Sequence, residues 1–177
     1  MKPWLFKELT VFLNEIEIRS LCEIGTHKGN TAIQLIKYLS SNNKHITYHG
    51  YDVFDFAKDN IEFNRKEKNG KGGASFDYVK NRLDNLKNVI TCFDYILLQG
   101  LTTDTLKEQS FDFVYIDGGH SYETVKHDYE KVLNSKLIIF DDAINKNANE
   151  VSKFLEEIKS QTHIEFYKRW AIVRNYA

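Results

Sequence analysis

Short apolar segments alternate along the chain with longer segments in which apolar side chains recur every three or four positions. The first pattern is typical of buried strands, and the second of helices that pack one face against a core. Strands are expected at residues 20–25, 46–52, 111–117 and 136–142, and in the second half of 89–100. Helices are expected at residues 1–18, 30–40, 121–133 (with Ser121 as N-cap) and 148–160.

The last part of the chain, residues 163–175, has the pattern of two strands in a tight hairpin with its turn near Lys168 and Arg169. Because helices separate the earlier strands, those strands should pair in parallel through right-handed crossovers. The pattern therefore predicts an α/β fold with a doubly wound, mostly parallel sheet of seven strands and an antiparallel C-terminal hairpin. A single domain over residues 1–177 is expected, since no repeat or linker is seen.

Residues 55–88 interrupt this alternation between the second and third strands. Their centre, residues 64–73 with the sequence NRKEKNGKGG, is polar and rich in lysine and glycine. This composition suits a solvated surface loop, and it equally suits a mobile lid, because long insertions in compact domains often serve a site. Ser75 is placed to cap a short helix that follows.

The composition is that of a globular domain, with 42% hydrophobic and 28% charged residues and a formal net charge of -1. This balance gives no general attraction to nucleic acid or membrane, and no run approaches the roughly 18 apolar residues of a membrane span. Cys22 and Cys92 lack metal-type spacing and are expected to be reduced thiols of a cytoplasmic protein. The N-terminal apolar run contains charges, unlike a signal peptide.

Most of the predicted strands finish on an acid or a glycine, which a hydrophobic core does not require. Ligands of open parallel sheets bind at these carboxyl ends. Gly25 and Gly29 let the first turn pass close to a ligand, although the turn lacks the third glycine of a dinucleotide-binding fingerprint. Asp52 ends the second strand, where related folds hold ribose hydroxyls; an aspartate there can equally hold a turn.

Four segments carry a family resemblance: LCEIGTHKGNTAIQL, YHGYDVFD, FDFVYIDGGHSYETVKHDYEKVL and LIIFDDA, in that order. Together they resemble a class I S-adenosylmethionine-dependent methyltransferase, which has a Rossmann-like fold. More narrowly, they resemble the macrocin and mycinamicin sugar O-methyltransferase group, and more distantly the catechol-type O-methyltransferases. The similarity spans residues 18–145, and its most specific part is IDGGHSYE followed by FDD.

The resemblance implies S-adenosylmethionine as the cofactor. The residues that it assigns to the cofactor are Glu23, Gly25, Thr26 and Gly29 at the methionine end, Asp52 at the ribose, Gly100, Leu101 and Thr102 near the adenine, and Asp117.

The resemblance also implies a divalent metal held by Asp117, Asp141 and Asp142, with His120 and Asp117 as catalytic residues and His120 as general base. Carboxylates at neighbouring strand ends repel one another unless a cation lies among them, and oxygen ligands suit Mg²⁺ or another hard divalent cation. Such an ion favours the alkoxide of a substrate hydroxyl, whose proton His120 could accept. Asp142 and His120 could instead serve only their turns, and Asp117 could serve the cofactor without a metal.

The expected function is methyl transfer to a hydroxyl of a sugar, glycan or related small metabolite. One alternative is a metal-free methyltransferase of a nitrogen or RNA acceptor, which the near-neutral charge and the lack of an Asn/Asp-Pro-Pro-Tyr/Phe motif oppose. Another is a non-catalytic cofactor-binding interaction module, which would have no reason to retain buried, mutually repelling acids. LNSK at residues 133–136 replaces the family's Lys-Pro-Gly-Gly turn, and the N-terminal region is short. Acceptor size and oligomeric state therefore stay open.

Overall fold

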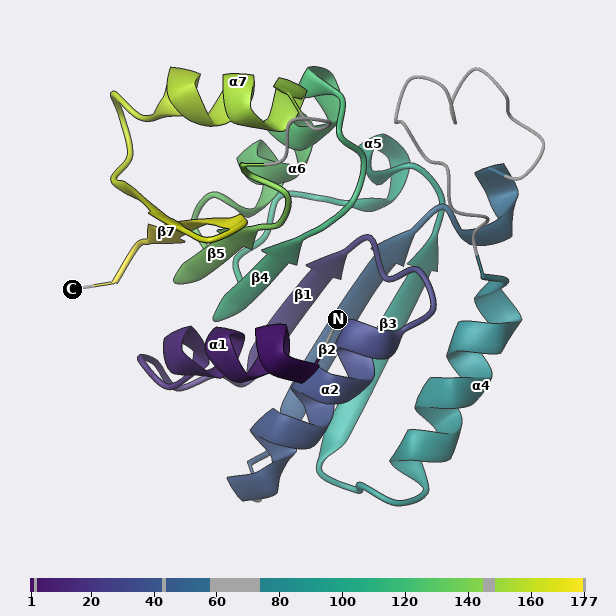
Figure 1. Ribbon diagram of the computed structural model, residues 1–177. Coiled ribbons are helices and arrows are strands. Elements are labelled where there is room, and N and C mark those ends of the chain that lie inside the picture. The colour runs from purple at the N-terminus through teal and green to yellow at the C-terminus, as the bar shows by residue number, and fades with distance from the viewer. Residues whose placement is uncertain (2, 43, 58–73, 145–148, 177) are drawn as a thin grey trace.

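The computed structural model describes residues 1, 3–42, 44–57, 74–144 and 149–176 (Figure 1). One seven-stranded sheet runs through the molecule in the order β3-β2-β1-β4-β5-β7-β6. The strands β1 to β5 are parallel, whereas β7 is antiparallel to β5 and β6 is antiparallel to β7. This topology confirms the predicted fold. The strand bounds are β1 Ser20–Ile24, β2 Ile46–Asp52, β3 Phe93–Gln99, β4 Phe113–Ile116, β5 Leu137–Phe140, β6 Ile164–Tyr167 and β7 Trp170–Arg174.

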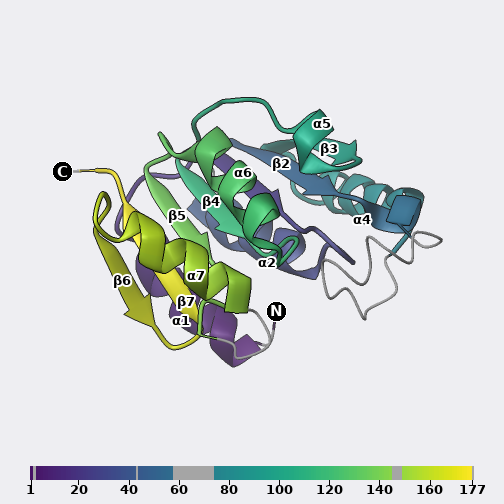
Figure 2. The same cartoon turned by 90° about the horizontal axis from the view of Figure 1, so that it is seen from above.

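Helices cover both faces of the sheet (Figures 1 and 2). One face carries α1 (Pro3–Leu13), α2 (Asn30–Leu39) and α4 (Phe76–Lys87), and the other carries α5 (Thr102–Thr105), α6 (Tyr122–Val132) and α7 (Asn149–Ile158). Two short 3-10 helices, η1 (Ser40–Asn42) and η2 (Phe54–Ala57), follow α2 and β2. Alternate residues of β4 enter the two cores, so that Phe113 packs on one side and Val114 on the other. Burial on both faces explains why these strands read as continuous apolar runs.

The order of the strands reverses between β1 and β4. From β1 the chain passes through α2 to β2, and from β4 it passes through α6 on the opposite face to β5. The carboxyl ends of β1 and β4 are held close together, because a Cβ on Gly25 would lie 2.1 Å from the carbonyl oxygen of Asp117. This switch point is where open α/β sheets bind their ligands.

The second part of the 55–88 insertion is a packed helix. Ser75 caps α4 as expected, its hydroxyl accepting a hydrogen bond from the backbone N–H of Tyr78. Val79, Leu83 and Leu86 are buried against the sheet. The expected lid at residues 64–73 lies outside the described residues.

The C-terminal hairpin turns at Lys168 and Arg169, as the pattern predicted. Lys168 has a positive φ of 55°, and Ala143 donates a backbone hydrogen bond of 2.8 Å to the carbonyl of Arg169. The hairpin therefore brings the Arg169 side chain to the end of β5. Within the described ranges, no helix is both long and apolar enough to cross a membrane.

Candidate active site

A cavity of about 1100 Å³ opens at the carboxyl edge of the sheet, beside the switch point. Met1, Trp4 and Leu5 of the N-terminal segment also line it. Glu23 and Gly29 are not among the residues that line it. The residues expected from the sequence that do line it are Gly25, Thr26, Asp52, Gly100, Leu101, Thr102, Asp117, His120, Asp141 and Asp142.

Asp52 links the loop after β1 to the loop after β2 at the cavity wall. One of its carboxylate oxygens accepts from the backbone N–H of His27 and the other from that of Phe54, both at 2.6 Å. Burial raises the pKa of Asp52, while these two backbone bonds act in the opposite direction. Each oxygen of a carboxylate can accept more than one hydrogen bond, so the side chain can hold its turn and also accept from a ligand hydroxyl.

Glu23 lies beneath the cavity, because its side chain points along the sheet to β2. It is only 1% exposed, and its Oε2 accepts a hydrogen bond of 2.7 Å from the hydroxyl of Tyr48. The same hydroxyl lies 3.2 Å from Oγ1 of Thr26 in the glycine turn. Burial raises the pKa of Glu23 to about 8. Glu23 therefore supports the turn from below in the free protein.

At the far end of β3, Gly100 has a φ of 141°, in a region open to glycine, and leads into the one-turn helix α5. His127 of α6 holds this segment, with Nε2 at 3.2 Å from the carbonyl of Thr102.

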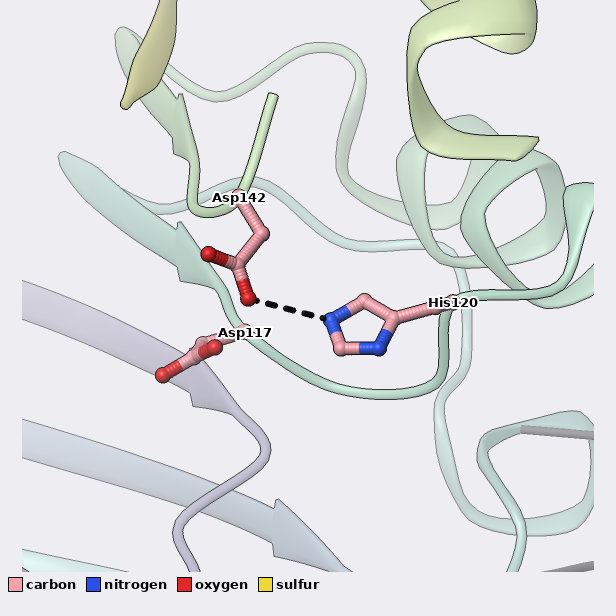
Figure 3. Close-up of side chains that lie close together, drawn as sticks. All are labelled: Asp117, His120 and Asp142. Carbon is pink, nitrogen blue, oxygen red and sulfur yellow. Dashed lines mark ion pairs between the residues drawn. The ribbon is translucent and has the colours of Figure 1, made fainter. Parts of the chain in front are cut away.

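The opposite wall of the cavity is acidic. Asp117, directly after β4, is half-buried; its removal from water, followed by the nearby charges of Asp141 and Asp142, raises its pKa well above the usual range. Asp117, His120 and Asp142 each offer a ligand atom within 4.8 Å of the others (Figure 3). They come from two neighbouring strand ends, since His120 follows the turn after β4 and Asp142 follows β5.

His120 and Asp142 face each other across this cluster (Figure 3). The Nε2 atom of His120 lies 3.6 Å from Oδ2 of Asp142, an ion-pair separation that is too long for a hydrogen bond. Among the described residues, this buried nitrogen has no hydrogen-bond partner. Asp142 adopts a positive φ of 54°, a strained value for an aspartate that often marks a functional position.

Asp141 lies outside the three-residue cluster and faces Arg169. The Nε atom of Arg169 lies 2.5 Å from Oδ1 of Asp141, and a terminal nitrogen of the same guanidinium pairs with Asp142. Burial raises the pKa of Asp141, whereas the Arg169 charge acts in the opposite direction. The group whose ligand atoms lie close together is thus Asp117, His120 and Asp142, and the metal set of Asp117, Asp141 and Asp142 stays a prediction.

Arg169 is the site residue that sequence reasoning missed. Its position in the hairpin turn was expected, but its partner Asp142 lies 27 residues earlier in the chain. The two meet only because β7 pairs with β5. The acids therefore do not by themselves require a metal, because the protein places its own cation, Arg169, beside them.

Comparison with known proteins agrees with this geometry. Residues 22–143 match the sequence family described as Methyltransferase domain. The chain belongs to this family and is a methyltransferase that depends on S-adenosylmethionine (SAM). No curated protein matches the chain.

Several solved structures share the fold. A Klebsiella pneumoniae protein provisionally named an O-methyltransferase is 14% identical with a TM-score of 0.67, and covers 100% of this chain and 82% of its own. The O-methyltransferase TomG of Streptomyces achromogenes, in complex with SAM, is 14% identical with a TM-score of 0.60 and coverage of 98% and 80%. The methyltransferase PaMTH1 of Podospora anserina, bound to SAH (the demethylated cofactor), is 13% identical with a TM-score of 0.62 and coverage of 100% and 80%.

Proposed function

We propose that the cavity binds SAM and that the protein transfers its methyl group to a hydroxyl of a sugar, glycan or related small metabolite. One observation carries the proposal: a single cavity joins a glycine turn and Asp52 on one side to His120 and Asp142 on the other. The first pair suits a nucleoside cofactor, and the second suits removal of a proton from a hydroxyl.

In the proposed complex, Asp52 accepts hydrogen bonds from the ribose hydroxyls. Gly25 and Thr26 lie along the methionine part of the cofactor, and the turn at Gly100 and Leu101 lies against the adenine. Asp52 already has both oxygens fixed by backbone groups, so it needs little reordering to receive the ribose. Glu23 supports this wall through Tyr48, as in the free protein.

The transfer itself is a displacement at the methyl carbon. The acceptor oxygen forms the new O–CH₃ bond while the S–CH₃ bond breaks, and both electrons of that bond remain on sulfur to give neutral SAH. The proton of the hydroxyl passes to His120, whose positive charge is then stabilised by Asp142 at 3.6 Å. The cavity walls supply the in-line positioning that such a displacement requires.

The acidic cluster also fits a divalent cation. The carboxylates of Asp117 and Asp142 point to one small volume beside His120, and carboxylate oxygens are suitable ligands for Mg²⁺ or Mn²⁺. Asp117 and Asp142 would hold the ion. When bound, it would polarise the acceptor hydroxyl and make its proton easier to remove.

Two features support a small hydroxylated acceptor. The cavity of about 1100 Å³ is larger than a cofactor-sized pocket, which leaves room for a second small molecule. The formal net charge of -1 offers no general attraction to RNA.

The test is methyl transfer from SAM carrying a labelled methyl group to a library of hydroxylated sugars and small metabolites. Products would be identified by mass spectrometry, and the methylated atom by NMR. The proposal expects the label on an oxygen, with a loss of product in the His120→Ala variant. Label on a nitrogen or on RNA would favour the alternative acceptors. Failure of SAM and SAH to bind would exclude the proposed use of the cavity.

A further inference from the structure

Arg169 is anchored beside the acidic cluster by main-chain and side-chain contacts. Its carbonyl accepts a hydrogen bond of 2.8 Å from the backbone N–H of Ala143, immediately after Asp142. Its side chain is 42% exposed, yet it pairs with the side chains of Asp141 and Asp142, which are only 6% and 17% exposed. The cation therefore stands between the solvent and the buried acids.

Asp142 is shared between two sides of the site. Its Oδ1 pairs with Arg169, and its Oδ2 faces His120 within the cluster that could hold a metal ion. A divalent cation bound to Asp142 would lie close to the guanidinium. Two positive charges at such a separation repel strongly where the surroundings exclude most water.

We propose that Arg169 is an internal counter-ion that competes with a divalent cation for Asp142. In the metal-free protein, Arg169 balances the buried acids; the cation binds only when the guanidinium moves away from Asp142. The inference rests on the proposed function in placing the cation at Asp117 and Asp142. It makes Arg169 a positioning residue that sets the affinity for metal, because a buried acid needs one cation or the other.

The test is the affinity for Mn²⁺, measured by calorimetry or by the electron paramagnetic resonance of the free ion. Arg169→Gln removes the charge but keeps a polar side chain, and it should bind Mn²⁺ at least about tenfold more tightly than the wild type. The matched control is Arg174→Gln. Arg174 lies at the other end of β7, where it pairs with Glu15 and Glu165, so its loss should leave Mn²⁺ affinity unchanged. Arg169→Lys, which keeps the charge, should bind Mn²⁺ much as the wild type does.

The melting temperature provides a second test of the competition between Arg169 and the metal ion. Without metal, Arg169→Gln should melt below the wild type, and saturating Mn²⁺ should raise its melting temperature more than that of the wild type. NMR of the wild type tests the proposal even if a variant does not fold. The Arg169 Nε–H signal should shift on addition of Mg²⁺, whereas that of Arg174 should not.

Mn²⁺ affinity in Arg169→Gln that is equal to or weaker than wild type would overturn the proposal. An Arg169 signal that does not respond to millimolar Mg²⁺, or the absence of Mn²⁺ binding in every variant, would also overturn it. SAH binding by the same samples is a separate measurement. Intact SAH binding with unchanged metal affinity would reject only the role of Arg169, whereas loss of SAH binding in the wild type would reject the proposed function.

Discussion

Removal of the acceptor proton depends on His120. Its Nε2 is buried between two carboxylates and has no hydrogen-bond partner within the described part of the chain. His120→Ala should lower kcat by about 10²–10⁴-fold, the usual cost of a lost general base, and should leave SAH affinity near that of the wild type. Steady-state kinetics and calorimetry on the same preparation measure both quantities.

The matched control for this variant is His45→Ala. His45 also pairs with an aspartate, its Nε2 lying 3.1 Å from Oδ2 of Asp94, but it is exposed at the opposite edge of the sheet. His45→Ala should keep the kcat of the wild type, because His45 does not line the cavity. Retention of most of kcat in His120→Ala would assign proton removal to another group.

The second prediction at the scale of single residues concerns Asp52. Asp52→Ala should weaken SAH binding by about 1.5–3 kcal/mol, because it removes charge-assisted hydrogen bonds to the ribose. Asp55→Ala is the control, since Asp55 lies three residues further on but bonds Gln99 and does not line the cavity. Asp52→Asn separates ligand binding from folding, because the amide oxygen can still accept one backbone bond. Equal SAH affinity in Asp52→Ala and the wild type would remove Asp52 from the site.

At the scale of elements, the turn after β1 depends on Gly25. Its φ of 93° suits glycine, and a Cβ there would lie 2.1 Å from the carbonyl oxygen of Asp117, which is too close for any side chain. Gly29 has a φ of 70°, but among the described residues a Cβ there would meet only a side-chain methyl of Val79, at 3.1 Å. Gly29→Ala should therefore cost about 1–2 kcal/mol of stability, from its left-handed backbone, and Gly25→Ala should cost more. Denaturant unfolding of the two variants measures the difference; equal losses would contradict this account of the turn.

The helices and strands could be predicted from the sequence because the spacing of apolar residues and the presence of turn residues are local properties of the chain. The seven strands, the cap at Ser75 and the hairpin turn were all visible in this way. The family resemblance places Glu23 at the methionine end of the cofactor, whereas in the free protein the alternation of side chains along β1 directs it to Tyr48. Arg169 was missed because its role depends on the pairing of β7 with β5, and a contact across strands leaves no local pattern.

For the molecule as a whole, the buried acids predict an unusual dependence of stability on pH. Burial raises the pKa of Glu23 to about 8 and also raises the pKa values of Asp52, Asp117 and Asp141. Between the ordinary glutamate pKa of 4.5 and about 8, the folded protein holds a proton on Glu23 that the unfolded chain has released. The free energy of unfolding should therefore fall as pH rises through this range, by an amount on the order of 1–3 kcal/mol between pH 5.5 and 8.

Urea unfolding of the free protein at several pH values measures this effect. Glu23→Gln keeps the shape of the side chain and has no proton to lose, so its stability should decline less steeply with pH. A wild-type protein that becomes more stable from pH 5.5 to 8 would contradict the buried, protonated state of Glu23.

The central claim is that one cavity joins a cofactor site to a proton-removing site, and a crystal structure with SAH tests it most directly. The account predicts the ribose hydroxyls of SAH within hydrogen-bonding distance of Asp52. It also predicts the sulfur on the side of the cavity that faces His120 and Asp142, with space between them for an acceptor. SAH bound outside this cavity, or with its ribose away from Asp52 and its sulfur turned from His120, would contradict the account.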